Sequence, residues 1–333
     1  FAFTASYIPG GFSLSHGQSR DSGPLPSGAT YSVSETVPAG WALETAVCVG
    51  DDDSTDPARI VLDPNETVTC TFTNRRTSSG PDATIYVATA TTGTVRGVTY
   101  ATGDILAYDG RSDSWSLYFD GSDVGWTRAV SDFTQLPDGS LLLVAGARTT
   151  LGAGATRFTL EVQDIARFVP TSLGQTTAGT FSLYFDGSDV TLSTAGERID
   201  ALAIKNDGTL LISTSDRATV KSGVTSITGQ DEDLLAFKPT QLGATTAGAW
   251  SLLPDGFDGS TLTGMAAEDV TGAWYNAATG DYYLTITNAF KVAGVKGNQR
   301  TVLKVTPAGA VSVYWDAATA GFTGTVDALW IVP

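Results

Sequence analysis

A short turn, Asp-Gly-Ser-Asp, occurs twice in the sequence, and its oxygen atoms could bind a cation. It occupies residues 120–123 and 186–189, and an altered form, Asp-Gly-Ser-Thr, occupies 258–261. Closely spaced carboxylate, hydroxyl and carbonyl oxygens suit calcium, although an EF-hand loop needs more ligands and a distal Glu. The same residues also form tight turns, in which Asp accepts backbone N–H groups and Gly adopts positive φ. A structural turn is favoured, and the alternative is a calcium site at Asp120, Asp123, Asp186 and Asp189.

A second group of acids lies where four similar strand-like segments begin. The equivalent positions are Ser131, Asp200, Asp269 and Asp327. If these strands line a central channel, three carboxylates converge on its axis and repel one another unless a cation or a water cluster lies between them. We therefore expect either a channel cation at the three aspartates or a capping role for them at neighbouring strand ends.

Other polar positions favour structural roles. A third set of acids is expected to cap strand starts: Asp104, Asp164 and Asp233, with Thr301 at the fourth position. The acidic run 51–56 is interpreted as a solvated loop, with calcium binding as the alternative. Asn65-Glu-Thr67 matches a glycosylation sequon by pattern alone.

Catalytic motifs are scarce. The single histidine, His16, has no nucleophile or orienting acid in a recognisable motif, which argues against Ser–His–Asp and Cys–His chemistry. There is no Walker loop, G-x-S-x-G or H-E-x-x-H. We expect no enzymatic activity. A polysaccharide hydrolase with two paired carboxylates stays open as an alternative, because spatial separation is invisible in the sequence.

Charge and cysteine content restrict the environment. The chain has a net charge of −16, so we expect no basic surface that could bind nucleic acid. No apolar run in the sequence reaches membrane-spanning length. Cys48 and Cys70 lie in one strand-rich region, and Cys70 belongs to the alternating run Thr-Val-Thr-Cys-Thr-Phe-Thr. We predict that the two cysteines form a disulfide bond in an oxidising compartment.

The elements that position these residues are short strands. Apolar residues alternate between Asp-Gly and Pro-Gly pairs, which predicts an all-β protein. The segment SLYFDGSDV occurs at 116–124 and again at 182–190, and four related units of roughly 60 to 70 residues can be aligned around it. Trp115, Phe181 and Trp250 are equivalent and are expected in the core. A less regular set, Trp126, Trp274, Trp315 and Trp330, could include an exposed ring that stacks on carbohydrate.

The four units predict a β-propeller with circular closure. The first unit lacks an opening strand, and the surplus segment 326–333 matches the strand that opens the third unit. Pairing this segment with the start of the first unit completes four four-stranded sheets. The expected domains are a small β-sandwich at 1–76, a linker at 77–82 and a four-bladed propeller at 83–333.

The first region carries a family resemblance. The run YSVSETVPAGWALETAVC, followed by LDPNETVTCTFTN, resembles the prealbumin-like (SpaA-type) β-sandwich modules of bacterial surface proteins. Such modules usually open with an extra strand, which is missing before Phe1. The resemblance implies a secreted or cell-surface protein of bacteria.

These observations predict a non-enzymatic extracellular structural protein, such as a self-assembling filament or surface-layer subunit. A sheet that lacks an edge strand exposes backbone groups that a neighbouring copy could pair with. The expected assembly segment is Phe1, Ala2, Phe3, Thr4, Ala5 and Ser6. The alternatives are a glycan- or protein-binding adhesion module and the hydrolase; possible cofactors are calcium or another cation, and possible partners are copies of the chain, other surface proteins or glycans.

Overall fold

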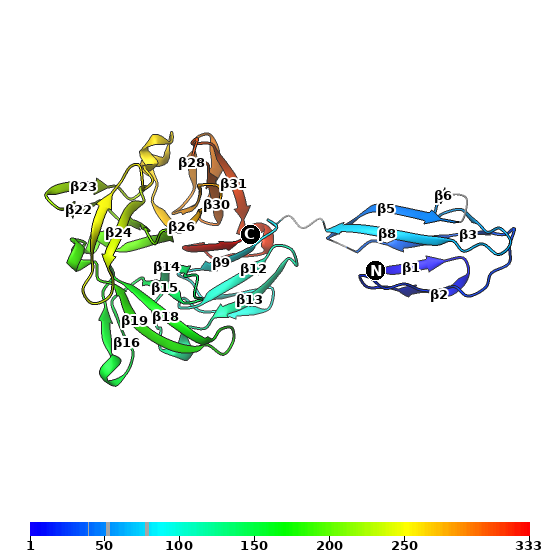
Figure 1. The fold of residues 1–333 in the computed structure, drawn as a ribbon, viewed down its shortest axis with the longest axis horizontal. Helices are drawn as coiled ribbons and strands as arrows, with labels where there is room; N and C mark the ends of the chain where they lie inside the picture. The colour runs from blue at the N-terminus through cyan, green and yellow to red at the C-terminus, as the bar shows by residue number, and fades with distance from the viewer. Residues whose placement is uncertain (39, 51–53, 77–79) are drawn as a thin grey trace. The chain divides into compact units, whose positions relative to one another are not determined.

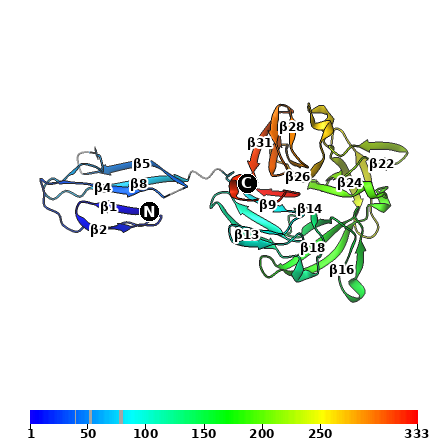
Figure 2. The ribbon, with the colours of Figure 1, turned by 180° about the vertical axis from the view of Figure 1, so that it is seen from behind.

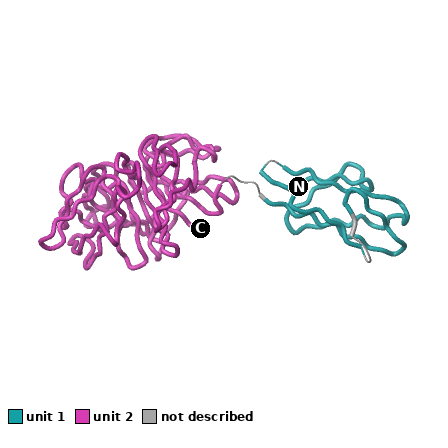
Figure 3. Tube along the Cα trace, turned by 90° about the horizontal axis from the view of Figure 1, so that it is seen from above, with its two compact units in different colours: residues 1–78 teal, residues 79–333 magenta. Residues whose placement is uncertain are grey.

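A computed structural model of the chain describes residues 1–333 except 39, 51–53 and 77–79. The chain divides into two compact units, Phe1–Ser78 and Ser79–Pro333 (Figure 3). Strands make up both units, and the helical elements in the described ranges are 3₁₀ turns of three or four residues. No helix among the described residues is long and apolar enough to span a membrane. The predicted all-β class is confirmed.

The described residues of the first unit form three small antiparallel sheets. Their strands are, in spatial order, β2 (Ile8–Ser13), β1 (Ala2–Ala5) and β4 (Val33–Thr36); β6 (Ser54–Thr55), β5 (Trp41–Val49) and β8 (Thr69–Arg76); and β3 (Thr30–Tyr31) with β7 (Ile60–Val61). Side chains alternate along each strand, so one face of each sheet points inward. The inward residues Phe3, Val33, Cys48 and Ile60 form the core.

Cys48 and Cys70 are directly opposite each other on β5 and β8 and form a disulfide bond. Cys48 is fully buried in the core of the first unit. The predicted disulfide is therefore confirmed, and it links two strands that already share a hydrogen-bonded ladder.

The N-terminal strand does not have the free edge that we expected. β1 pairs with β4 on one side and with β2 on the other. The N-terminal ammonium of Phe1 donates to the carbonyl of Leu14 at 2.9 Å, and the N–H of Ser6 donates to Ser32 at 2.9 Å. The predicted assembly segment Phe1 to Ser6 is therefore wrong as an open edge, because the chain itself supplies both neighbours.

The second unit contains four four-stranded antiparallel sheets. From inside to outside they are β32 (Ala328–Val332), β9 (Thr84–Ala88), β12 (Ile105–Asp109), β13 (Ser114–Phe119); β14 (Val130–Gln135), β15 (Leu141–Ala145), β18 (Ile165–Ser172), β19 (Ala178–Phe185); β20 (Ile199–Ile204), β21 (Leu210–Thr214), β24 (Leu235–Gln241), β25 (Ala247–Ser251); and β26 (Val270–Asn276), β27 (Asp281–Ile286), β30 (Thr301–Val305), β31 (Val311–Asp316). We call them the first to fourth sheets.

The four sheets lie around a common centre (Figures 1 and 2). Their inner strands β32, β14, β20 and β26 contact one another there. β32 pairs with β9 from Ala328 opposite Ala88 to Val332 opposite Thr84, so the first sheet combines strands from both ends of the unit.

Each sheet also carries a small two-stranded ribbon between its second and third strands. The alignment of the four repeat units did not predict these ribbons. The ribbons are β10 (Gly93–Val95) with β11 (Val98–Tyr100), β16 (Thr149–Leu151) with β17 (Phe158–Leu160), β22 (Ala218–Ser222) with β23 (Thr225–Gly229), and β28 (Phe290–Val292) with β29 (Val295–Gly297). The core of the unit is divided into four hydrophobic clusters, one between each pair of neighbouring sheets. We call each such region a joint.

Candidate functional site

One carboxylate, that of Asp132, joins the four inner strands at the centre of the second unit. Asp132 lies on β14 and is fully buried. Its two oxygens accept a backbone N–H from each inner strand. The donors are Phe133, Leu202, Ala273 and Leu329, at 2.8, 2.6, 3.1 and 3.0 Å. Burial raises the pKa of Asp132, and the four N–H donors oppose that rise.

Small residues on the other inner strands leave room for this carboxylate. The residues that precede the three donors on β20, β26 and β32 are Ala201, Gly272 and Ala328. A Cβ at Gly272 would lie 2.6 Å from Thr285 Oγ1 and 3.2 Å from Ala328 Cα, so only glycine fits there. Four sheets therefore share a single acid.

In the predicted ring of Ser131, Asp200, Asp269 and Asp327, Ser131 and Asp200 occupy equivalent places, whereas Asp269 does not. A β-bulge interrupts the pairing of β14, β20 and β26 at the same point, and the bulged residues are Ser131, Asp200 and Thr271. Asp269 precedes β26. Asp327 accepts hydrogen bonds from the Ala90 N–H at 2.6 Å and the Thr325 hydroxyl at 2.7 Å, which is a capping role.

Asp200 and Asp269 nevertheless form an acidic pair across the joint between the third and fourth sheets. Asp200 is 4 % exposed, and neither of its carboxylate oxygens has a hydrogen-bond partner among the described residues. Burial and then the charge of Asp269 raise the pKa of Asp200, while Arg198 lowers it. Burial raises the pKa of Asp269 to about 6, against a hydrogen bond from Thr287 at 3.1 Å.

No group of three or more His, Cys, Asp or Glu side chains in the described part of the chain is arranged to hold a metal ion. The channel cation and the calcium turns therefore stay predictions.

The repeated turns use their first aspartates internally. Asp120 Oδ1 accepts the N–H of Ser122 at 3.0 Å and its hydroxyl at 2.7 Å, and Asp186 makes the same two bonds to Ser188. A third set of acids, Asp104, Asp164 and Asp233, holds the start of each turn through the N–H groups of Gly121, Gly187 and Gly259. The predicted capping by this third set is confirmed.

The second aspartates of the repeated turns bind the neighbouring sheet. Asp123, which follows the first sheet, accepts the N–H of Thr177 at 2.8 Å, and the N–H of Asp120 donates to the Thr177 hydroxyl at 2.9 Å. Thr177 lies in the loop between β18 and β19 of the second sheet. We call this contact a clasp. Asp189 makes the second clasp with Thr246, in the loop between β24 and β25, at 2.8 Å.

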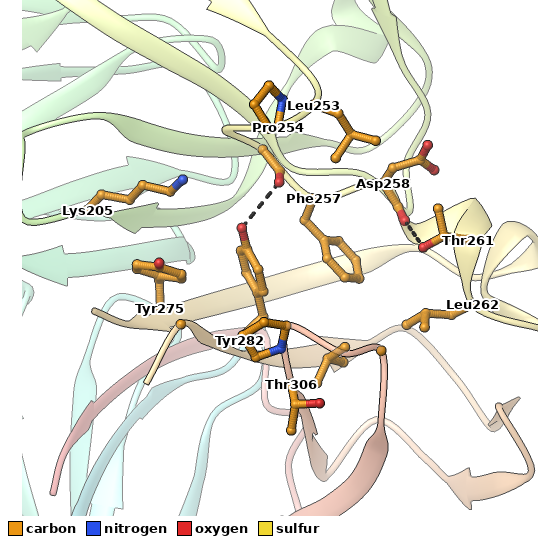
Figure 4. A pocket seen from close by; sticks show the side chains of 15 residues that line it. Lys205, Leu253, Pro254, Phe257, Asp258, Thr261, Leu262, Tyr275, Tyr282 and Thr306 are labelled. Carbon is orange, nitrogen blue, oxygen red and sulfur yellow. Dashed lines mark hydrogen bonds between the residues drawn. The ribbon is translucent and has the colours of Figure 1, made fainter. Parts of the chain in front are cut away.

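Among the described residues, the joint between the third and fourth sheets has no such clasp. Its turn has Thr261 in place of the second aspartate, and the hairpin of the fourth sheet is shorter, because β30 has five residues against seven in β24 and eight in β18. The preceding segment, Leu253–Phe257, replaces the Tyr118-Phe119 pair of the first copy and is three residues longer (five against two). A cavity of about 350 Å³ lies at this joint (Figure 4).

The remaining predicted positions show no further site. His16 and Asn65 are exposed, and residues 51–53 of the acidic run lie outside the described residues. The core aromatics Trp115, Phe181 and Trp250 are buried. In the less regular set, Trp126 and Trp315 are buried, and Trp274 and Trp330 are partly buried against the core.

Sequence reasoning missed Asp132 and the cavity. A signal for the cavity was present, because the third copy of the repeat is longer than the first two.

A comparison with protein families gives a match within the first unit. Residues 4–76 match the model of a family described as a prealbumin-like fold domain, which confirms the predicted fold of this region. No curated protein matches the chain.

Three solved structures show low overall similarity to the chain. PorZ, described as a bacterial surface component of the type-IX secretion system of Porphyromonas gingivalis, aligns at 12 % identity and a TM-score of 0.27 over 66 % of this chain and 30 % of its own. Virginiamycin B lyase from Staphylococcus aureus aligns at 8 % identity and a TM-score of 0.25 over 68 % of this chain and 69 % of its own. YCF48 bound to a D1 peptide aligns at 10 % identity and a TM-score of 0.27 over 75 % of this chain and 85 % of its own. The chain thus spans less than a third of PorZ, and these scores carry no functional argument.

Proposed function

We propose that this chain is a non-enzymatic structural protein of the bacterial cell surface, composed of a prealbumin-like module and a four-bladed β-propeller closed by β32. The observation that carries the proposal is how the repeated carboxylates are used. Asp104, Asp120 and Asp123, with their counterparts in the next sheet, accept hydrogen bonds from the chain's own backbone. The residues that the sequence repeats therefore build turns and joints.

The position of the acidic pair also supports a non-enzymatic role. A glycosidase needs two carboxylates that both reach the scissile bond. Asp200 is almost fully buried at the centre of the unit, which keeps a polymer substrate away from it. Incubation with starch, cellulose, xylan and chitin should release no reducing ends. Release that disappears in Asp200→Asn or Asp269→Asn would overturn this part of the proposal.

The disulfide and the family match support a location outside the cytoplasm. Disulfides such as Cys48–Cys70 persist mainly in oxidising compartments. Surface biotinylation of intact cells that express the chain should label it, and exclusive recovery in the unlabelled cytoplasmic fraction would contradict the location.

Self-association is assigned to β8 rather than to the N-terminal strand. β8 is eight residues long and stands at the edge of its sheet, with no second partner strand among the described residues. The exposed side chains Thr69, Thr71 and Thr73 lie beside the exposed Val47 and Val49 of β5, which gives an uncharged face. Six residues of this edge strand, Thr69 to Asn74, carry no charge, and Arg75 and Arg76 end it. An uncharged edge segment pairs readily with another chain, and here the partner is a second copy.

Negative-stain electron microscopy tests the assembly. The wild-type chain should form filaments or dimers, and Thr71→Lys should disperse them because it places a charge on the pairing face. Thr159→Lys, on the exposed ribbon of the second sheet, is the matched control and should assemble normally. Loss of filaments in chelator would give the acidic groups a cation role, and discrete monomers at every concentration would overturn self-association.

A further inference from the structure

The cavity at the joint between the third and fourth sheets exists because one repeat lacks a side chain that the others have. The pairs Ile105 with Phe119, Ile165 with Phe185 and Leu234 with Phe257 are equivalent. The residue before each phenylalanine is Tyr118, Tyr184 and Gly256, respectively. Each tyrosine packs against the core of its joint, and Tyr118 also accepts a hydrogen bond from Gln135 at 2.9 Å.

Gly256 cannot carry a replacement for that ring. A Cβ there would lie 2.2 Å from the Leu234 carbonyl oxygen and 2.4 Å from that of Leu252. These are backbone atoms, so no side-chain movement relieves the clash. The space that Tyr118 and Tyr184 fill in the earlier joints is therefore left open by the backbone path of the inserted segment.

Aromatic rings line the open space. Tyr275 on β26 and Tyr282 on β27 are directly opposite each other, with ring centroids 5.1 Å apart, and Phe257 lies 5.1 Å from Tyr282. The residues equivalent to Tyr282 in the second and third sheets are Leu141 and Leu210, which are fully buried. The two tyrosines are only partly buried, so their faces border the cavity (Figure 4).

Polar groups are placed beside these rings. Lys205 Nζ lies 5.4 Å from the centroid of the Tyr275 ring and donates to the carbonyl of Asp255. The Tyr282 hydroxyl donates to the carbonyl of Gly256 at 3.2 Å. Both contacts hold the inserted segment in place. A lysine ammonium has three N–H donors, so Lys205 retains donors for a ligand.

We propose that this cavity binds a neutral pyranose ring, as the end or a branch of a glycan. Its volume is at the lower end of the range for small-ligand pockets, which suits one sugar ring. Aromatic faces pack against the apolar C–H face of a sugar, and Lys205 donates hydrogen bonds to the sugar hydroxyl groups. Asp258 balances the charge of Lys205 at the lining, and the chain's net charge of −16 repels anionic sugars. This binding function does not depend on self-association.

Saturation-transfer difference NMR on the full chain tests the proposal. The probes are the methyl glycosides of glucose, galactose, mannose and N-acetylglucosamine, with methyl glucuronoside as the charged comparison and hexaproline as the peptide comparison. At least one neutral glycoside should bind, with a dissociation constant of roughly millimolar order for so small a ligand. Tyr275→Ala should weaken binding about tenfold through loss of the ring face. Gln135→Ala, the equivalent position in the second sheet, should leave binding unchanged.

A second variant guards against misfolding of the first. Replacing Leu253–Phe257 by the Tyr-Phe pair of the earlier copies should fill the space and abolish binding, while the turn at Asp258 stays intact. The saccharide assignment is overturned if no neutral glycoside binds, if hexaproline or the glucuronoside binds in preference, or if folded Tyr275→Ala and the shortened chain both bind like wild type.

Discussion

The joint between the second and third sheets and the joint between the third and fourth are built from the same repeat but end differently. In the former, Asp189 clasps Thr246 and Tyr184 fills the space between the sheets. In the latter, Thr261 and Gly256 hold the corresponding places, and a cavity lies between the sheets. We call these the clasped joint and the open joint.

The open joint differs at its inner end as well. There, burial and then the charge of Asp269 raise the pKa of Asp200, and neither side chain has its full set of hydrogen bonds among the described residues. The comparison teaches that the complete repeat satisfies its own polar groups and fills its own space. A repeat that departs from the pattern leaves polar groups without partners in the described chain and leaves space unfilled.

The largest effect should come from Asp132, because it serves clasped and open joints alike. Asp132→Ala leaves four buried N–H groups without an acceptor, and each unsatisfied group costs about 1–3 kcal/mol. We expect the free energy of unfolding of the second unit to fall by more than about 4 kcal/mol in urea titrations. Ser131→Ala is the control, with a change below about 0.5 kcal/mol. A loss of under about 1 kcal/mol for Asp132→Ala would contradict the shared role.

The acidic pair should make the open joint sensitive to pH. The folded-state pKa values of Asp200 and Asp269 lie above the ordinary value near 3.8, and that of Asp269 is about 6. Between about pH 4 and pH 6 the folded state thus binds more protons than the unfolded state, so the free energy of unfolding falls as the pH rises.

Asp269→Asn should remove much of this fall. It should raise stability at pH 7 by about 1–2 kcal/mol, after allowance for solvent screening. Urea titrations of wild type and variant across pH 4–7 measure the difference, which cancels the contributions of other acids. Parallel pH profiles for the two chains would exclude the proposed repulsion.

Removal of a clasp should have a smaller effect, confined to one joint. Asp189→Ala deletes a charged acceptor of the Thr246 N–H, which should cost about 1–2 kcal/mol. Native-state hydrogen exchange should become faster at Thr246 and stay unchanged at Thr177, whose clasp is intact. Equal acceleration at both sites would show that the clasps are not independent.

The smallest effect should come from restoring only the acid at the open joint. The hairpin of β30 and β31 is too short to present a counterpart of Thr246, because β30 has five residues against seven in β24, so Thr261→Asp should change the free energy of unfolding by less than about 0.5 kcal/mol. A gain above about 1 kcal/mol would show that the hairpin can form a clasp after all.

The sequence predicted what repetition and alternation encode: an all-β chain, the disulfide and the capping aspartates of the third set. It could not predict Asp132. In three sheets a bulge shifts the side-chain alternation by one residue, which brings the residue after Ser131 to the centre. The counterparts of Asp132 are Ala201, Gly272 and Ala328, so no repeated acid marked the position. The bulge depends on how strands pair, which a single strand does not reveal.

The N-terminal strand was misjudged for a related reason. The expected neighbour of β1 was a strand preceding Phe1, whereas the structure uses β2, which follows β1 in the chain. The residues Ile8–Ser13 that form β2 contain two glycines and little alternation, so their strand character was weak in the sequence.

The pairing of β32 with β9 has a consequence for the order of events during synthesis. Sheets two to four are each made from one continuous stretch of chain, so each can form soon after it leaves the ribosome. The first sheet must wait, because Ala88 meets Ala328 only after 240 further residues (328 − 88) have been added. At ordinary rates of translation this delay is roughly 10 to 50 s. Throughout that interval the inner edge of β9 is unpaired, which makes this strand the point at which a nascent chain is most exposed to mispairing.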